Sequence, residues 1–121
     1  MSLAIHHLAL RVADPLASAD FYRGVLGLPE LRRFLDADGR ARSVWLRAGG
    51  AVLMLEREIK VRAAAEGSGH VLVLKVEALA PWEALLAKAG VDVEERTEFT
   101  VYFQDPDGHR VGLSVYPERP K

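Results

Sequence analysis

The sequence predicts an α+β domain in which a βαβββ order of strands and helix occurs twice. In each half of the chain, alternating apolar and polar residues, typical of strands, give way to apolar residues at helical spacing. A glycine then ends each expected helix at a similar distance from the preceding strand. Gly27 follows Val12 by 15 residues. In the second half, Gly90 follows Val76 by 14 residues.

The first half opens with an expected strand at His7 to Val12, where side chains alternate between two faces. Asp14-Pro15 supplies an N-cap and a first-turn proline for a helix that ends at Gly27. Turn signals at Asp36 to Gly39 and at Gly49-Gly50 then separate three more strands. These strands are expected at about Glu30 to Leu35, Ala41 to Arg47 and Ala51 to Glu56.

The second half repeats this order. A strand at Val71 to Glu77 precedes a helix that Pro81 opens and Gly90 closes. The stretch Asp105 to Gly108 makes the turn between the last two strands. The remaining strands are expected at about Asp92 to Arg96, Phe99 to Gln104 and Arg110 to Tyr116.

We expect residues 1–121 to form one domain, with an N-terminal module of about 1–60 and a C-terminal module of about 67–121. Lys60 to Gly69 is the expected linker between them. Modules of this size cannot each bury a sufficient core, so they must pack together or exchange with a second copy.

Composition excludes several classes of partner. The formal net charge is -1, from 16 basic and 17 acidic residues, so no strong field favours nucleic acid or an anionic membrane. No apolar run reaches the roughly 20 residues of a membrane helix, and no signal peptide is evident. The chain has no cysteine, which favours a reducing cytoplasm. Asn is absent, as in many thermophilic proteins, although a GC-rich genome produces the same bias.

Three stretches of this sequence resemble the vicinal-oxygen-chelate superfamily, the family of glyoxalases, bleomycin-resistance proteins and extradiol dioxygenases. They are His7 to Asp14, Phe21 to Leu28 (similar to the family's FYxxVLGL) and Phe103 to His109 (similar to its DPDG turn). The resemblance implies two βαβββ modules, each a curved, mixed four-stranded sheet with an outer helix, facing a shared cleft. It also implies a homodimer, sometimes with modules exchanged between chains. The superfamily holds lyases, isomerases, dioxygenases and metal-free drug binders, so the resemblance leaves the reaction open, and even whether the chain is an enzyme.

The resemblance also implies where a metal would bind. Family ligands lie on the first and last strands of each module and hold a divalent ion that acts as a Lewis acid. On the first strands, the ligand position corresponds to His7 in one module and to Val71 in the other. On the last strands, the family's glutamate corresponds to Met54 and Gly112. Only His7 is a good ligand for such an ion, so we expect the ordinary metal site to be absent.

Two residues close to the expected ligand positions leave a metal-dependent enzyme possible as an alternative. His70 precedes Val71 by one residue, a step that turns its side chain to the other face of the strand. Glu56 lies two residues beyond Met54, on the same face. A glyoxalase-type lyase or isomerase, or a ring-cleaving dioxygenase, with nickel, zinc, iron or manganese would need His7 and Glu56, with His70 turned inward. No cofactor is otherwise expected.

Apolar side chains at the former ligand positions predict a pocket for a small, partly apolar molecule in the cleft between the modules. Arg11 and Lys75 occupy matching positions and would bind an acidic ligand or form rim salt bridges, for example to Glu56. A third possibility is an interaction module whose own side chains fill the cleft. The candidate ligand-binding residues, with His7 the best candidate for a catalytic role, are His7, Arg11, Met54, Glu56, Val71, Lys75, Phe103, Gly112 and Ser114.

Overall fold

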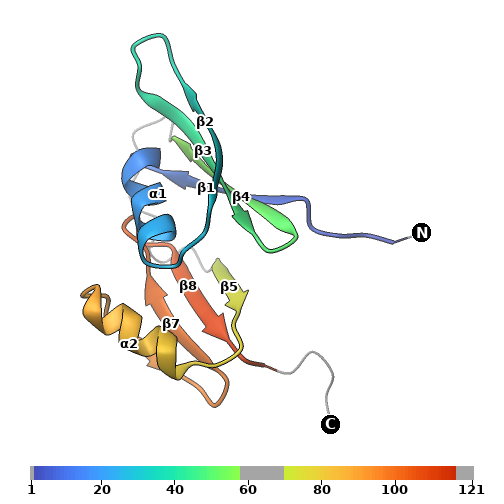
Figure 1. The fold of residues 1–121 in the computed structure, drawn as a ribbon, viewed down its shortest axis with the longest axis vertical. Coiled ribbons are helices and arrows are strands. Elements are labelled where there is room, and N and C mark those ends of the chain that lie inside the picture. The colour runs from blue at the N-terminus through green and yellow to red at the C-terminus, as the bar shows by residue number, and fades with distance from the viewer. Residues whose placement is uncertain (1, 58–69, 117–121) are drawn as a thin grey trace. The chain divides into compact units, whose positions relative to one another are not determined.

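The structure, a computed structural model, describes residues 2–57 and 70–116. The chain divides into two compact units, residues 1–65 and 66–121. Each unit contains one four-stranded sheet and one helix (Figure 1). The expected linker at Lys60 to Gly69 lies outside the described residues.

The first unit has the predicted βαβββ order. Its sheet has the strand order β1-β4-β3-β2, in which β1 and β4 are parallel and the other pairs are antiparallel. The parallel pair requires a crossover, and the chain provides it through the helix and the β2–β3 hairpin. Its elements are β1 (His7–Val12), α1 (Pro15–Gly24), β2 (Glu30–Leu35), β3 (Ala41–Ala48) and β4 (Ala51–Arg57).

The second unit repeats this topology, with the strand order β5-β8-β7-β6 and a parallel β5–β8 pair. The α+β class and the repeated βαβββ order are thereby confirmed. Several strands are shorter than expected, and β6 has only two residues. The elements are β5 (Val71–Lys75), α2 (Ala80–Lys88), β6 (Glu95–Arg96), β7 (Thr100–Gln104) and β8 (Arg110–Ser114).

Each helix is followed by a glycine with positive φ, 73° at Gly27 and 76° at Gly90. Other residues rarely adopt this conformation. It turns the chain so that later N–H groups reach back to helix carbonyls, as Val91 N does to Leu86 O at 2.9 Å. The glycine positions in the sequence therefore predict the helix ends to within a few residues.

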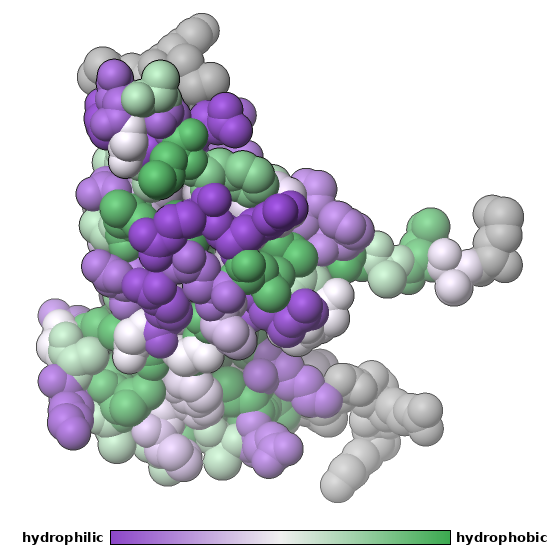
Figure 2. Space-filling view, turned by 45° about the horizontal axis from the view of Figure 1, so that its top comes forward, coloured by the Kyte–Doolittle hydropathy of each residue, from purple (hydrophilic) through white to green (hydrophobic). Residues whose placement is uncertain are grey.

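In the first unit the core lies between the sheet and α1, which packs against β3 and β4 (Figure 1). The N-terminal segment before β1 adds nothing to this core, because Leu3 and Ile5 are exposed; Figure 2 shows the segment as a projecting arm. Neither described helix has the length and hydropathy needed to span a bilayer. The buried apolar residues of this unit include Leu10, Val12, Ala19, Tyr22, Leu26, Val44, Leu46, Leu53 and Leu55.

The β2–β3 and β7–β8 hairpins close through the same hydrogen-bonded turn. In the first, Asp36 Oδ1 accepts from Asp38 N and Arg40 N, both at 3.0 Å. In the second, Asp105 Oδ1 accepts from Asp107 N at 2.9 Å and from His109 N at 2.8 Å. A single aspartate thus satisfies two turn N–H groups in each unit, which is a structural reason for the repeated Asp-x-Asp-Gly sequence.

We expect Asp105→Ala to lower the free energy of unfolding by about 2 kcal/mol, because the N–H groups of Asp107 and His109 lose the buried carboxylate that accepts both hydrogen bonds. Asp105→Asn keeps an acceptor oxygen and should lose less than half as much. Urea unfolding followed by circular dichroism measures both values. Equal losses in the two variants would contradict the role given to the acceptor.

The Asp36 turn should make stability depend on pH. The hydrogen bond from Arg57 and those from the turn N–H groups hold the pKa of Asp36 below its ordinary value. A carboxyl with a depressed folded pKa stabilises the fold above its unfolded pKa of about 3.9, and this stabilisation is lost as pH falls through the folded pKa. Asp36→Asn should therefore destabilise the protein at pH 7 and much less at pH 2.

Arg57→Gln is the matched variant, since the ion pair needs both partners. Because Arg57→Gln leaves the turn N–H groups bound to Asp36, unfolding free energies measured from pH 2 to 7 should show a pH dependence between those of the wild type and Asp36→Asn. A wild-type slope in either of them would show that the pair does not contribute.

Candidate functional site

The face of the first sheet opposite α1 carries the candidate site. Along β1 the side chain of Leu10 is buried and that of Arg11 is exposed, because successive residues of a strand point to opposite faces. Arg11 lies opposite Glu56 on β4, and Glu56 lies opposite Ser43 on β3. Residues paired across strands share a face, so these three side chains form one row across the sheet.

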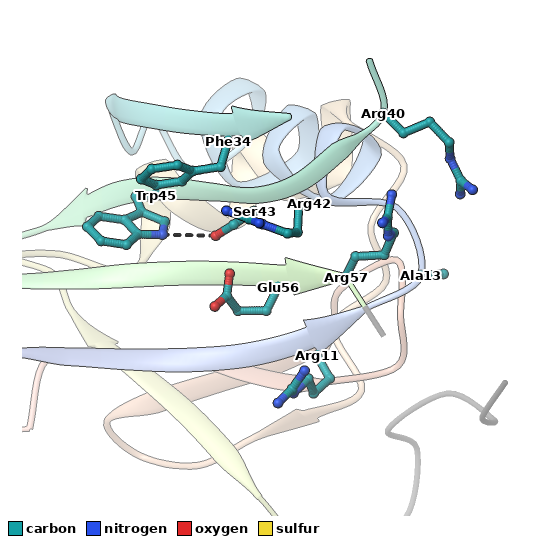
Figure 3. A pocket seen from close by; sticks show the side chains of 9 residues that line it. All are labelled: Arg11, Ala13, Phe34, Arg40, Arg42, Ser43, Trp45, Glu56 and Arg57. Atoms are coloured by element: carbon teal, nitrogen blue, oxygen red, sulfur yellow. Dashed lines mark hydrogen bonds between the residues drawn. The ribbon is translucent and has the colours of Figure 1, made fainter. Parts of the chain in front are cut away.

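A pocket of about 620 Å³ lies along this row, near the ends of β1, β2 and β4 and the start of β3 (Figure 3). This volume falls within the range of small-molecule sites. The lining residues all belong to the first unit: Arg11, Ala13, Phe34, Arg40, Arg42, Ser43, Trp45, Glu56 and Arg57.

One end of the pocket is aromatic. The rings of Phe34 and Trp45 lie 5.2 Å apart between centroids, tilted by 57°. Trp45 Nε1 donates a hydrogen bond to Ser43 Oγ at 2.9 Å, drawn in Figure 3, which fixes the indole. The guanidinium of Arg32 lies 5.2 Å from the centroid of the Phe34 ring, a cation–π arrangement. The rings are thus held in place by neighbours within the sheet.

The rest of the pocket is cationic, because four arginines line it and Glu56 is the one acidic lining residue. Arg57 Nη1 lies 2.8 Å from Asp36 Oδ2 and 3.4 Å from the Ala41 carbonyl oxygen that accepts its hydrogen bond. These contacts hold Arg57 at the pocket wall. With its charge offset by Asp36, the remaining lining arginines still outnumber the acidic residues, so the pocket carries a net positive charge.

The surviving ligand position, His7, lies apart from the pocket carboxylate. His7 is opposite Val52, and Glu56 is four residues further along β4, about 13 Å at the rise of a strand. His7 Nδ1 lies 2.9 Å from His6 Nδ1, and His70 is an exposed residue just before β5. Across residues 2–57 and 70–116, no group of three or more potential ligand side chains is arranged to hold a metal.

In the second unit, an aromatic ring lies close against the position of the family's glutamate. Gly112 lies opposite Val73 on β5 and opposite Tyr102 on β7. A Cβ at Gly112 would stand 3.1 Å from two carbons of the Tyr102 ring. The guanidinium of Arg110 lies 4.5 Å from the centroid of the same ring. The residues present therefore do not fit a metal here, for steric as well as chemical reasons.

Three residues of the second unit that were expected to bind ligand do not line the pocket of the first sheet. Lys75 is exposed and lies opposite Ser114, whose Oγ accepts a 2.7 Å hydrogen bond from Thr100 Oγ1. Phe103 was also expected to bind ligand. Its side chain is fully buried in the core, opposite Val111. The preceding residue of β7 points to the other face of the sheet, and that is the face that carries Gly112.

Of the residues expected from sequence, the structure brings Arg11 and Glu56 together in the pocket. His7 and Met54 share their face of the first sheet but lie outside the pocket lining. The segment from Arg32 to Arg47 contains five arginines, and this density of positive charge could have predicted the cationic wall of the pocket. The lining residues that sequence reasoning missed are Ala13, Phe34, Arg40, Arg42, Ser43 and Arg57.

Comparison with known proteins places this geometry in a family. The metallothiol transferase FosB of Bacillus licheniformis is 30% identical over 123 residues, covering 92% of this chain and 74% of that protein. A glyoxalase family protein from Enterococcus faecalis is 26% identical with a TM-score of 0.74, covering 92% of this chain and 96% of that one. TnmS3, an antibiotic binding protein from a Streptomyces species, shares the fold at 22% identity and a TM-score of 0.73, covering 94% and 97%.

The sequence profile of one family matches residues 4–113, which include the described parts of both units almost entirely. This match confirms the resemblance seen in the three sequence stretches. The chain belongs to the glyoxalase/bleomycin resistance protein/dioxygenase superfamily.

Proposed function

We propose that this protein binds a small, partly apolar molecule in the pocket of the first sheet, without using a metal ion. The observation that carries the proposal is the pocket itself, where Phe34 and Trp45 adjoin a cationic wall. The aromatic rings offer an apolar surface and the charged wall offers polar partners, so the pocket can hold a molecule that is apolar at one end. The expectation that the ligand lies between the two modules stays a prediction.

The residues at the family's metal positions support a metal-independent role. His7 is about 13 Å from the nearest pocket carboxylate along the strands, beyond the reach of a shared ion. The Tyr102 ring fills the space that a side chain at position 112 would need. The fold serves such a role elsewhere, since TnmS3 is an antibiotic binding protein.

A second candidate is a metal-dependent enzyme of this family, and the observation that favours it is the 30% identity to a metallothiol transferase. It would recruit His7 together with a carboxylate and would include the lyase, isomerase and dioxygenase chemistries of the superfamily.

We also propose a cytoplasmic homodimer, because the chain has no cysteine and each half has a small core.

Metal content and ligand binding together test the proposal. Protein purified without chelator should carry nickel, zinc, iron and manganese far below one equivalent by plasma mass spectrometry. In a thermal-shift screen, a compound that binds the native state should raise the melting temperature equally before and after EDTA treatment. Trp45→Ala should abolish this shift, because it removes the aromatic end of the pocket.

Near-stoichiometric metal that is lost in His7→Ala would establish the metalloenzyme instead. A ligand that stabilises only the metal-loaded protein would lead to the same conclusion. A broad screen in which no compound raises the melting temperature would favour an interaction module and defeat the binding proposal.

Placing the family's glutamate at position 112 should destabilise the protein. Gly112→Glu is expected to lower the free energy of unfolding by about 1–3 kcal/mol, because its Cβ would crowd the Tyr102 ring. In a Tyr102→Ala background the same substitution should cost less. Urea unfolding of the four proteins in this double-mutant cycle gives both costs. The same cost in both backgrounds would rule out steric filling by the ring.

A further inference from the structure

We infer that the ligand of this pocket is an aromatic monoanion, such as an aryl carboxylate, with its ring against Trp45 and its charge among the arginines. The inference rests on the proposed function and adds the chemical class of the ligand. It follows from the separation of two kinds of side chain within one pocket.

The ring of the ligand has a place at the aromatic end. The indole N–H of Trp45 is already bound to Ser43, so Trp45 offers an incoming molecule its ring surface rather than a hydrogen-bond donor. Phe34 lies at 5.2 Å beside it, and both residues line the pocket. Flat aromatic groups pack on such rings with more contact than branched aliphatic groups do.

The anionic group has a place at the cationic wall. Figure 3 shows the two rings at one end, Arg40 and Arg57 at the other, and Arg11 and Glu56 between them. Guanidinium groups bind carboxylates with two parallel hydrogen bonds, and they keep their charge at any physiological pH. The net positive charge of the lining therefore selects an anion over a neutral or cationic molecule of the same shape.

Glu56 limits the charge of the ligand. It lies on β4 between Ser43 on one side and Arg11 on the other. A second anionic group placed at the middle of the pocket would meet this carboxylate and be repelled. The ligand is therefore singly charged at one end, and Glu56→Gln should tighten its binding.

Spectroscopy of a single tryptophan can test this class directly. The chain has two tryptophans, so Trp82→Phe leaves Trp45 as the only indole reporter. The probes are 2-naphthoate, the uncharged 2-naphthalenemethanol and the non-aromatic cyclohexanecarboxylate. We expect 2-naphthoate to quench Trp45 with a Kd about tenfold lower than that of the alcohol, which lacks one charge-assisted contact. Its Kd should also be about tenfold lower than that of cyclohexanecarboxylate, which keeps the charge but lacks the aromatic ring.

Arginine variants test whether the pocket binds the anionic group of the probe. Arg40→Gln and Arg42→Gln should each weaken 2-naphthoate several-fold and leave 2-naphthalenemethanol unchanged. Both arginines are exposed, so the substitutions should not disturb folding, and circular dichroism checks this. The matched control is Arg47→Gln, on the same strand as Trp45 but outside the lining, which should change neither Kd. Added salt should weaken only the anion.

Three results would overturn the inference, and they are distinguishable. If 2-naphthalenemethanol binds as tightly as 2-naphthoate and the arginine variants do not change either Kd, the ligand need not be an anion, but the proposed function stands. Equal binding of cyclohexanecarboxylate would remove the aromatic requirement alone. If no probe binds, a library compound that stabilises the protein through Trp45 would overturn only the ligand class. If no compound at all binds, the proposed function fails as well.

Discussion

The period of two along a β-strand is the constraint on which this structure depends. Because successive side chains point to opposite faces, the burial of Leu10 and Val12 in the core requires Arg11 between them to face away. The same rule on β4 buries Leu55 and turns Glu56 to the open face. A slip of one residue would exchange the two faces, so the core and the pocket are fixed by a single register.

Much of the fold could be predicted because its signals are local. Positive-φ glycines end both helices, and the aspartate of each Asp-x-Asp-Gly turn binds two N–H groups of its own turn. Such signals act over a few residues and can be read without knowing the rest of the chain. Strand ends were less predictable, since β5 ends at Lys75 although Val76 continues the alternation.

The site was harder to predict, because it depends on which strands are neighbours. Phe34 on β2 and Arg57 at the end of β4 line one pocket only because β3 lies between their strands. The face on which Phe103 lies could be predicted from the sequence. Counting outward in equal steps from the Asp105 turn pairs Phe103 with Val111 and Tyr102 with Gly112. This register predicts that Tyr102, not Phe103, shares a face with Gly112.

The two units differ physically at the positions that the resemblance assigns to metal ligands. In the first unit His7 persists, but the charges of its sheet face are gathered at the opposite end of β4, around Glu56. In the second unit the missing side chain at Gly112 has been replaced by the volume of a tyrosine ring. The first change leaves an open, charged pocket, whereas the second closes the space. The proposed binding role of the first sheet therefore does not depend on His7, whereas a side chain at position 112 would need space beside the Tyr102 ring.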